Sequence, residues 1–154
     1  MQNEGMSMNQ QRRLSSAMKD FLDASIKQLK YQEENHFPDL DTYKSLRLHS
    51  IGCLIYSVPF ELAVGLDLSN DFLQHPLVNA LQRVLCFQIM FVNDIYSFQK
   101  EFSEGDFINL LPILLFEYLK DNKDKWDNNL LHIPNGNNAS NIEIIARNIV
   151  SQAL

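Results

Sequence analysis

The sequence predicts an all-α protein, and three observations support this fold class. Apolar residues recur at spacings of three and four positions over most of the chain, which is the period of an amphipathic helix. The alternating pattern of a β-strand is not found at any length, and no segment repeats internally. Glycine and proline are sparse, with five of each in 154 residues, and most of them fall between the helical segments.

The composition limits where such a protein acts. No run approaches the roughly 18–20 apolar residues of a membrane span, and the N-terminus has no apolar stretch typical of a signal peptide. The net charge of −6 argues against a nucleic-acid partner, because phosphate binding needs a basic surface. Cys53 and Cys86 lie in apolar segments without CxxC spacing, so we expect buried thiols rather than zinc ligands or a disulfide. A cytoplasmic location is the default expectation, and the oligomeric state is not predicted.

The first helix is predicted over residues 10–35. Its apolar positions include Leu14, Met18, Phe21 and Leu22, with lysine and glutamate between them. Residues 1–9 are polar and contain a glycine, which predicts a disordered lead-in.

The second helical stretch is predicted over residues 41–55, after a stop at Pro38 and Asp39. Gly52 and Pro59 mark positions where it should bend or break. It then resumes as FELAVGL, and LSNDFLQHP should form a loop.

The third helix, over residues 77–102, is the longest and most apolar, so we expect it at the centre of the fold. Gly105 and Asp106 end it, and a fourth helix follows over residues 107–119, with Pro112 in its first turn or at a kink. The helical domain thus covers residues 10–120. Residues 121–140 are rich in asparagine and should form a long loop, and residues 141–154 begin a last helix whose apolar pattern still runs at the end of the sequence.

The stretch NDIYSFQKE interrupts the apolar pattern of the third helix. Asn93, Ser97 and Glu101 are four residues apart, so each is turned by only about 40° from the last and lies about 6 Å further along the axis. Such a ladder of oxygen atoms suits Mg²⁺, which takes hard oxygen ligands and shares its remaining positions with water or phosphate. The same spacing also occurs by chance on solvated helix faces. The apolar residues upstream favour an inward face, where polar groups need a partner.

NDIYSFQKE resembles the second metal-binding motif of class I terpene synthases, (N/D)Dxx(S/T)xxxE, often with lysine before the glutamate. The resemblance implies the helical bundle of that family, with Asn93, Ser97 and Glu101 holding one Mg²⁺ of a three-ion cluster on the diphosphate of an isoprenoid substrate. It also implies that Lys100 contacts the diphosphate. The downstream EGDFINLL is similar to the family's usual continuation.

A second match involves Arg47, in the context Tyr43-Lys-Ser-Leu-Arg47. Microbial-type members of the family carry a diphosphate-sensing arginine in a YxxxR context, 46 positions before the first metal ligand, and Arg47 precedes Asn93 by that distance. A guanidinium suits this role because its planar fork donates two hydrogen bonds to phosphate oxygens and keeps its charge. The break near Gly52 also fits the helix interruption that follows the sensor in this family.

Two family features are not found in the sequence. No Asp-rich DDxxD-type motif precedes Arg47, and there is no Arg-Tyr dipeptide. The trans-prenyltransferases share the fold but use two all-carboxylate motifs, which the Asn/Ser/Glu pattern does not match. We therefore expect a C-terminal-half fragment of a microbial-type terpene cyclase bundle, incomplete at both ends and inactive alone.

The resemblance implies Mg²⁺-dependent ionisation and cyclisation of a prenyl diphosphate such as farnesyl diphosphate, with release of diphosphate. Ile89 and Cys86, one and two turns before Asn93, are candidate walls for the hydrocarbon. No catalytic residue is assigned. The alternative is a truncated, noncatalytic remnant or a helical subunit that binds a partner. Whether this chain is an enzyme is left open at this point.

Overall fold

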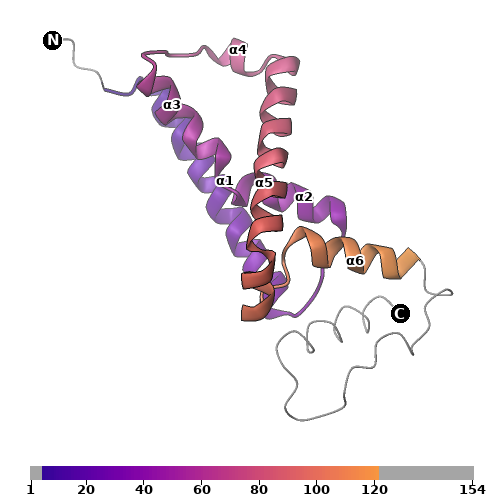
Figure 1. Ribbon diagram of the computed structural model, residues 1–154. Helices are drawn as coiled ribbons and strands as arrows, with labels where there is room; N and C mark the ends of the chain where they lie inside the picture. Colours follow the sequence, from indigo (N-terminus) through magenta and orange to yellow (C-terminus); the bar gives the residue numbers. More distant parts are fainter. Residues whose placement is uncertain (1–4, 122–154) are drawn as a thin grey trace, which may run out of the picture. The chain divides into compact units, whose positions relative to one another are not determined.

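The computed structural model describes residues 5–121, and every regular element in this range is a helix. The predicted all-α fold class is thereby confirmed for the described part of the chain. The elements are shown in Figure 1 and are, in order, α1 (Met8–Glu33), α2 (Leu40–Ser50), the 3-10 helix η1 (Cys53–Tyr56), α3 (Ser57–Ala63), α4 (Asn70–Leu73), α5 (Pro76–Glu104) and α6 (Leu110–Asp121). The predicted loop after residue 121 and the last helix lie outside the described residues.

Contacts divide the described chain into two compact units. The first unit comprises residues 5–27 and 45–90, and the second comprises residues 28–44 and 91–121. Three helices, α1, α2 and α5, pass from one unit into the other.

The first helix starts two residues earlier than the sequence predicts and ends at Glu33, because Asn35 takes the left-handed conformation with φ of 50°. Asp39 then caps α2, since its Oδ1 accepts the Thr42 backbone N–H at 2.8 Å. This hydrogen bond holds the pKa of Asp39 below its usual value. The predicted stop and restart at Pro38 and Asp39 is confirmed.

The break at Gly52 is confirmed, and it comes earlier than the predicted helix end at residue 55. Helix α2 ends at Ser50, and Gly52 has φ of +78°, a conformation that strains residues with a Cβ atom. A break at Pro59 was predicted wrongly. Pro59 lies in the first turn of α3, where its missing N–H removes no helical hydrogen bond.

Two boundaries further along the chain also differ from the prediction. The segment LSNDFLQHP, predicted as a loop, contains the single-turn helix α4. Ser69 caps its start, and the Ser69 Oγ accepts the Phe72 N–H at 3.2 Å. Helix α6 starts at Leu110 rather than residue 107, and Pro112 falls in its first turn without a break. The three residues before Leu110 are buried outside any helix.

The first unit has a small apolar core and a buried ion pair. Val58, Cys86 and Met90 are almost fully buried. Arg13 of α1 donates from both terminal nitrogens to the carboxylate of Glu61 on α3, at 2.5 and 2.6 Å, and Glu61 also accepts the Leu68 N–H at 3.1 Å. This bidentate contact joins α1 to α3 and, through the Leu68 N–H, to the loop that follows α3.

The second unit is built around aromatic stacking. The ring of Phe37, before α2, lies 4.6 Å from the Phe107 ring and 5.3 Å from the Phe116 ring, measured between centroids. Tyr43 and Ile113 are fully buried in the same unit. The core of this unit therefore forms between the α2 region and the start of α6.

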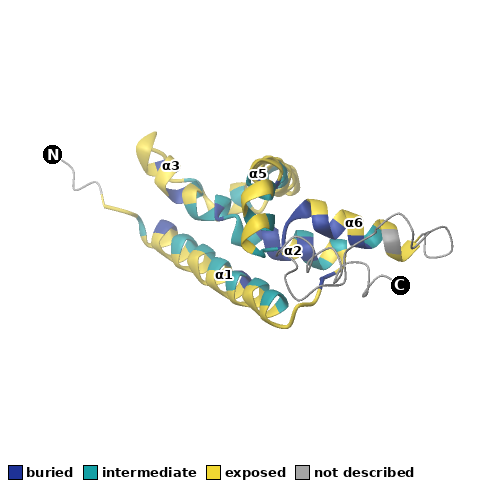
Figure 2. Cartoon of the chain, turned by 60° about the horizontal axis from the view of Figure 1, so that its bottom comes forward, coloured by how far each residue is buried: buried dark blue, intermediate teal, exposed yellow. Residues whose placement is uncertain are grey.

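Helix α5 is less buried than its apolar sequence predicts. Its most buried residues, Cys86, Met90 and Asp94, recur every four positions, whereas Leu81 is 69% exposed and Tyr96 86% exposed (Figure 2). A helix that is apolar on all sides is normally buried. The expectation that α5 lies at the centre of the fold is therefore not borne out within the described residues. No described helix has the length and apolarity that crossing a membrane requires.

We expect Glu61→Gln to lower the free energy of unfolding by about 1–3 kcal/mol at pH 7, because the partly exposed Arg13 charge would lose its charged hydrogen-bond partner. Arg13 lowers the pKa of Glu61 below its unfolded value of about 4.3, mainly through the hydrogen bond. The contribution of Glu61 is therefore complete at neutral pH and is lost as the pH falls below about 4, through the folded-state pKa.

Urea unfolding at pH 7 and pH 3 measures this difference. The control is Asp23→Asn, which removes the exposed pair of Asp23 with Lys19 and should change little. A wild-type advantage over Glu61→Gln that is as large at pH 3 as at pH 7 would contradict the assignment.

Candidate metal centre

The three ladder residues lie in the part of α5 that belongs to the second unit, and α5 is uninterrupted there. They are Asn93, Ser97 and Glu101. Their four-residue spacing places them on one face, as the sequence predicts. Asn93 is exposed, whereas Ser97 and Glu101 are half-buried. The expectation that this face turns inward therefore holds for the last two residues and is wrong for Asn93.

A buried amide holds the last member of this ladder. Asn109 is fully buried and precedes the first residue of α6. Its Nδ2 donates to Glu101 Oε2 at 2.8 Å and to the backbone carbonyl of Asp94 at 2.8 Å, and its Oδ1 accepts the Leu111 N–H at 3.1 Å. One side chain thus caps α6 and contacts two residues of α5.

Asp94, the neighbour of Asn93 in the motif, is fully buried. Its Oδ2 accepts the Tyr43 hydroxyl and the Leu110 backbone N–H, the latter at 3.1 Å. Burial raises the pKa of Asp94 to about 7, and the Leu110 hydrogen bond acts in the opposite direction. Because its carboxyl is closed to solvent and held by these donors, Asp94 is an anchor between helices and is not placed as a metal ligand.

The ladder fits an oxygen-binding cation by its donor chemistry. The Ser97 hydroxyl oxygen is buried and makes no hydrogen bond within the described residues. An unsatisfied buried hydroxyl is unfavourable, and a cation on the same face would satisfy it. Glu101 adds a carboxylate and Asn93 an amide oxygen, which are the ligand types that Mg²⁺ prefers. Residues 5–121 contain no cluster of three or more His, Cys, Asp or Glu side chains placed for a metal, so this mixed set is the candidate.

The two predicted diphosphate contacts differ in burial. Lys100 lies on α5 in the second unit and is exposed, with a side chain accessible to a ligand in solution. Arg47 lies on α2 in the first unit and is 8% exposed. A buried guanidinium is uncommon without an anionic or polar environment. Their roles toward a diphosphate remain predictions.

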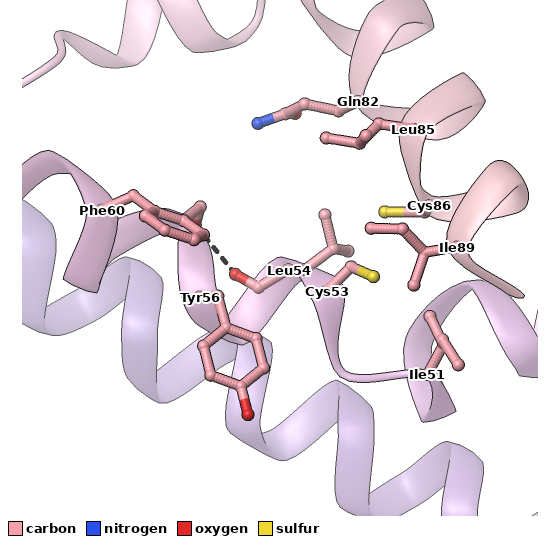
Figure 3. Close-up of a pocket in the computed structure, with 10 residues that line it drawn as sticks. Ile51, Cys53, Leu54, Tyr56, Phe60, Gln82, Leu85, Cys86 and Ile89 are labelled. Carbon is pink, nitrogen blue, oxygen red and sulfur yellow. Dashed lines mark hydrogen bonds between the residues drawn. The ribbon is translucent and has the colours of Figure 1, made fainter. Parts of the chain in front are cut away.

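The first unit contains an apolar cavity of about 470 Å³ between η1, α3 and α5 (Figure 3). Two of its lining residues, Cys86 and Ile89, are those that the sequence suggests as hydrocarbon walls. The wall is apolar apart from Ser57 and Gln82. It is lined by Ile51, Cys53, Leu54, Tyr56, Ser57, Phe60, Gln82, Leu85, Cys86 and Ile89.

The two cysteines are free thiols, and both line this cavity (Figure 3). Burial, with a smaller contribution from the neighbouring Cys53, raises the pKa of Cys86 to about 11. Burial also raises the pKa of Cys53. The expectation of a buried thiol is confirmed for Cys86, whereas Cys53 is only half-buried, and the two thiols form no disulfide in the structure.

Comparison with protein families decides the classification. The model described as "Terpene synthase family 2, C-terminal metal binding" matches residues 2–121, which include the ladder, Arg47 and Asn109. The chain belongs to the terpene synthase family. The predicted resemblance is therefore confirmed, and the matched region corresponds to the C-terminal metal-binding domain of this family.

Several curated terpene synthases are similar to this chain. Sesquiterpene synthase 3 of Postia placenta is 34% identical over 62% of the chain, alpha-muurolene synthase of Coprinopsis cinerea is 32% identical over 68%, and 10-epi-cubebol synthase of Sorangium cellulosum is 28% identical over 69%. These alignments cover 26%, 25% and 34% of the relatives' own lengths. The chain thus spans about a quarter to a third of the terpene synthases that it matches.

Asp94 and Asn109 are not among the site residues that the sequence predicts. Asp94 is part of the NDIYSFQKE motif. It follows Asn93 by one residue and so points about 100° away around the helix, which already indicates that Asp94 lies on a different face from the ladder. Asn109 lies in EGDFINLL, directly before an apolar run, where an asparagine predicts a helix N-cap. Its contact with Glu101 depends on the turn between the helices, which periodicity does not describe.

We expect Tyr43→Phe to lower the free energy of unfolding by about 1–3 kcal/mol, because the buried Asp94 carboxyl would lose a donor while the ring stays in place. Urea unfolding measures the loss. The matched control is Tyr96→Phe, which removes a hydroxyl from an 86% exposed tyrosine on α5 and should have no effect. Equal stabilities for the two variants would contradict the role of the Tyr43 hydroxyl.

Alkylation of Cys86 by iodoacetamide should be slow in the native chain. With a pKa of about 11, roughly one molecule in a thousand carries the Cys86 thiolate at pH 8, and the rate should rise about tenfold per pH unit up to pH 10. Mass spectrometry of timed samples measures the rate, with the urea-unfolded chain as control. A native rate that levels off below pH 9 would show that the thiol is not perturbed in this way.

Proposed function

We propose that this chain supplies a Mg²⁺ site and part of the substrate contacts of a class I terpene synthase that acts on a prenyl diphosphate. The observation that carries the proposal is the ladder on α5. Ser97 presents a buried hydroxyl without a hydrogen-bond partner in the described residues, and Glu101 lies one turn further with its carboxylate held by a buried amide. Membership of a metal-binding terpene synthase family supports it.

Asn93, Ser97 and Glu101 would hold the ion. When bound, Mg²⁺ neutralises the negative charge that develops on the diphosphate leaving group as the allylic carbon–oxygen bond breaks. The set carries one negative charge, so a divalent ion on it keeps net positive charge and attracts an anionic substrate.

Lys100 and Arg47 are proposed to bind the diphosphate. Lys100 is an exposed ammonium on the metal-binding helix, next to Glu101, and suits the outer oxygens of a phosphate as a flexible point charge. Arg47 carries a permanent charge, and its side chain is mostly buried. Burial would hold the guanidinium in one direction before the diphosphate binds. Both residues would bind and orient the leaving group.

The apolar cavity of the first unit is proposed as a wall for the hydrocarbon part of the substrate. Its lining has few polar groups, so it would exclude water from a reactive carbocation. Sesquiterpene synthase 3 of Postia placenta, one of the relatives described above, is named for sesquiterpene chemistry, which favours farnesyl diphosphate, the 15-carbon precursor, as the substrate.

A noncatalytic helical subunit is the second candidate. The observation that favours it is the exposure of large apolar residues along α5, including Leu77, Leu81 and Val84. Such residues are typical of a surface that another polypeptide covers. In this case the chain would bind a partner and form no terpene by itself.

The metal site is tested by adding Mn²⁺ to the chain with inorganic diphosphate and following free Mn²⁺ by electron paramagnetic resonance. We expect Ser97→Ala and Glu101→Ala each to weaken binding by about tenfold or more, because each removes a ligand oxygen. Glu104→Ala is the control, since it removes an exposed carboxylate from the end of the same helix. Unchanged binding in Glu101→Ala would refute the site.

The activity itself is tested by incubating the chain with Mg²⁺ and farnesyl diphosphate and analysing the headspace for hydrocarbons. A terpene that depends on Mg²⁺ and disappears in Asn93→Ala and Glu101→Ala supports the enzyme. Metal binding without any hydrocarbon product supports the noncatalytic alternative.

A further inference from the structure

The turn after α5 brings a later residue back onto the ladder. Gly105 has φ of +88°, which ends the helix, and the Asp106 N–H donates to the Glu101 carbonyl at 2.8 Å. Asp106 Oδ1 then accepts the Ile108 N–H at 3.0 Å. This tight return explains how Asn109, eight positions after Glu101, reaches its carboxylate.

Asn109 is fixed before any ligand binds. Both protons of its amide are used, one on Glu101 Oε2 and one on the Asp94 carbonyl, and its oxygen caps α6 through the Leu111 N–H. A fully buried side chain held at three points cannot rotate without breaking at least one of these bonds. The direction in which it donates to Glu101 is therefore set by backbone groups on two helices.

We propose that Asn109 is a positioning residue that orients the Glu101 carboxylate for metal binding, an inference that rests on the proposed function of the ladder. A glutamate side chain has three rotatable bonds, and holding Oε2 removes most of that freedom while Oε1 keeps its lone pairs for a cation. Hydrogen bonds to a ligating carboxylate from residues behind it commonly change metal affinity by about 10–100-fold. Asn109 itself touches neither metal nor substrate.

Asparagine is the side chain that this position requires. Serine would keep an oxygen to cap α6 and would lose the donor to Glu101. Aspartate would keep the size and the cap, and would place a second carboxylate against Glu101 in a buried setting. These two substitutions separate the cap, which any of the three residues can provide, from the amide donation, which only asparagine provides.

The experiment compares Asn109→Ser with Ile113→Val, a buried substitution on α6 that removes one methylene and does not touch the ladder. Melting temperatures give the stability of each variant, and the Mn²⁺ titration with inorganic diphosphate gives its metal affinity. We expect a lower melting temperature and an affinity about tenfold weaker for Asn109→Ser, and an unchanged affinity for Ile113→Val, with both affinities measured well below each variant's melting temperature. Asn109→Asp serves in place of Asn109→Ser if the serine variant does not fold.

The outcomes distinguish the two proposals. If Glu101→Ala loses Mn²⁺ affinity and the folded Asn109 variant matches Ile113→Val, the ladder stands and the positioning role is refuted. If the wild-type chain leaves the free Mn²⁺ signal unchanged, or Glu101→Ala binds as well as wild type, the metal site itself is refuted and the positioning role falls with it. A selective loss of affinity in the Asn109 variant supports the role.

Discussion

The buried carboxyl of Asp94 is the constraint on which the second unit depends. Taking a carboxyl out of water is unfavourable unless donors replace the water, and here the donors come from Tyr43 on α2 and Leu110 at the start of α6. The raised pKa of Asp94 reflects the part of that penalty that the donors do not offset. Because each donor belongs to a different helix, satisfying one carboxyl fixes α2, α5 and the first turn of α6 together.

The same arrangement explains how one short motif can combine a role in folding with the metal binding that we propose for the ladder. Adjacent residues on a helix differ by about 100° in direction, so Asp94 can be fully buried while Asn93 is exposed beside it. Asn109 connects the two functions, since it donates to the backbone of the anchor and to the carboxylate of the ladder. A substitution in this network is therefore expected to affect stability and metal affinity together, and only a stability-matched comparison separates them.

Much of the fold follows from the sequence because helices depend on local signals. Periodicity located α1 and α5, the Asp39 cap located the start of α2, and Gly52 located the break that its positive φ requires. The four-residue spacing of the ladder was visible for the same reason. The contact of Asn109 with Glu101 was not, because it depends on a turn that reverses the chain. The burial of α5 was overestimated from its apolar composition. Composition indicates which residues of a helix can be buried, but it does not identify the elements that pack against them.

The exposed apolar residues of α5 show why the polar network is needed. Hydrophobic contacts have little directionality, and a helix that is apolar on many sides can pack against a neighbour in several registers. Hydrogen bonds from Tyr43, Leu110 and Asn109 to one residue of α5 allow a single register, because a shift by one residue would leave a buried carboxyl and a buried amide unsatisfied. The network thus supplies the specificity that the apolar surface lacks. The network acts on the segment of α5 that carries the ladder, whose oxygen atoms must stay on one face of the helix.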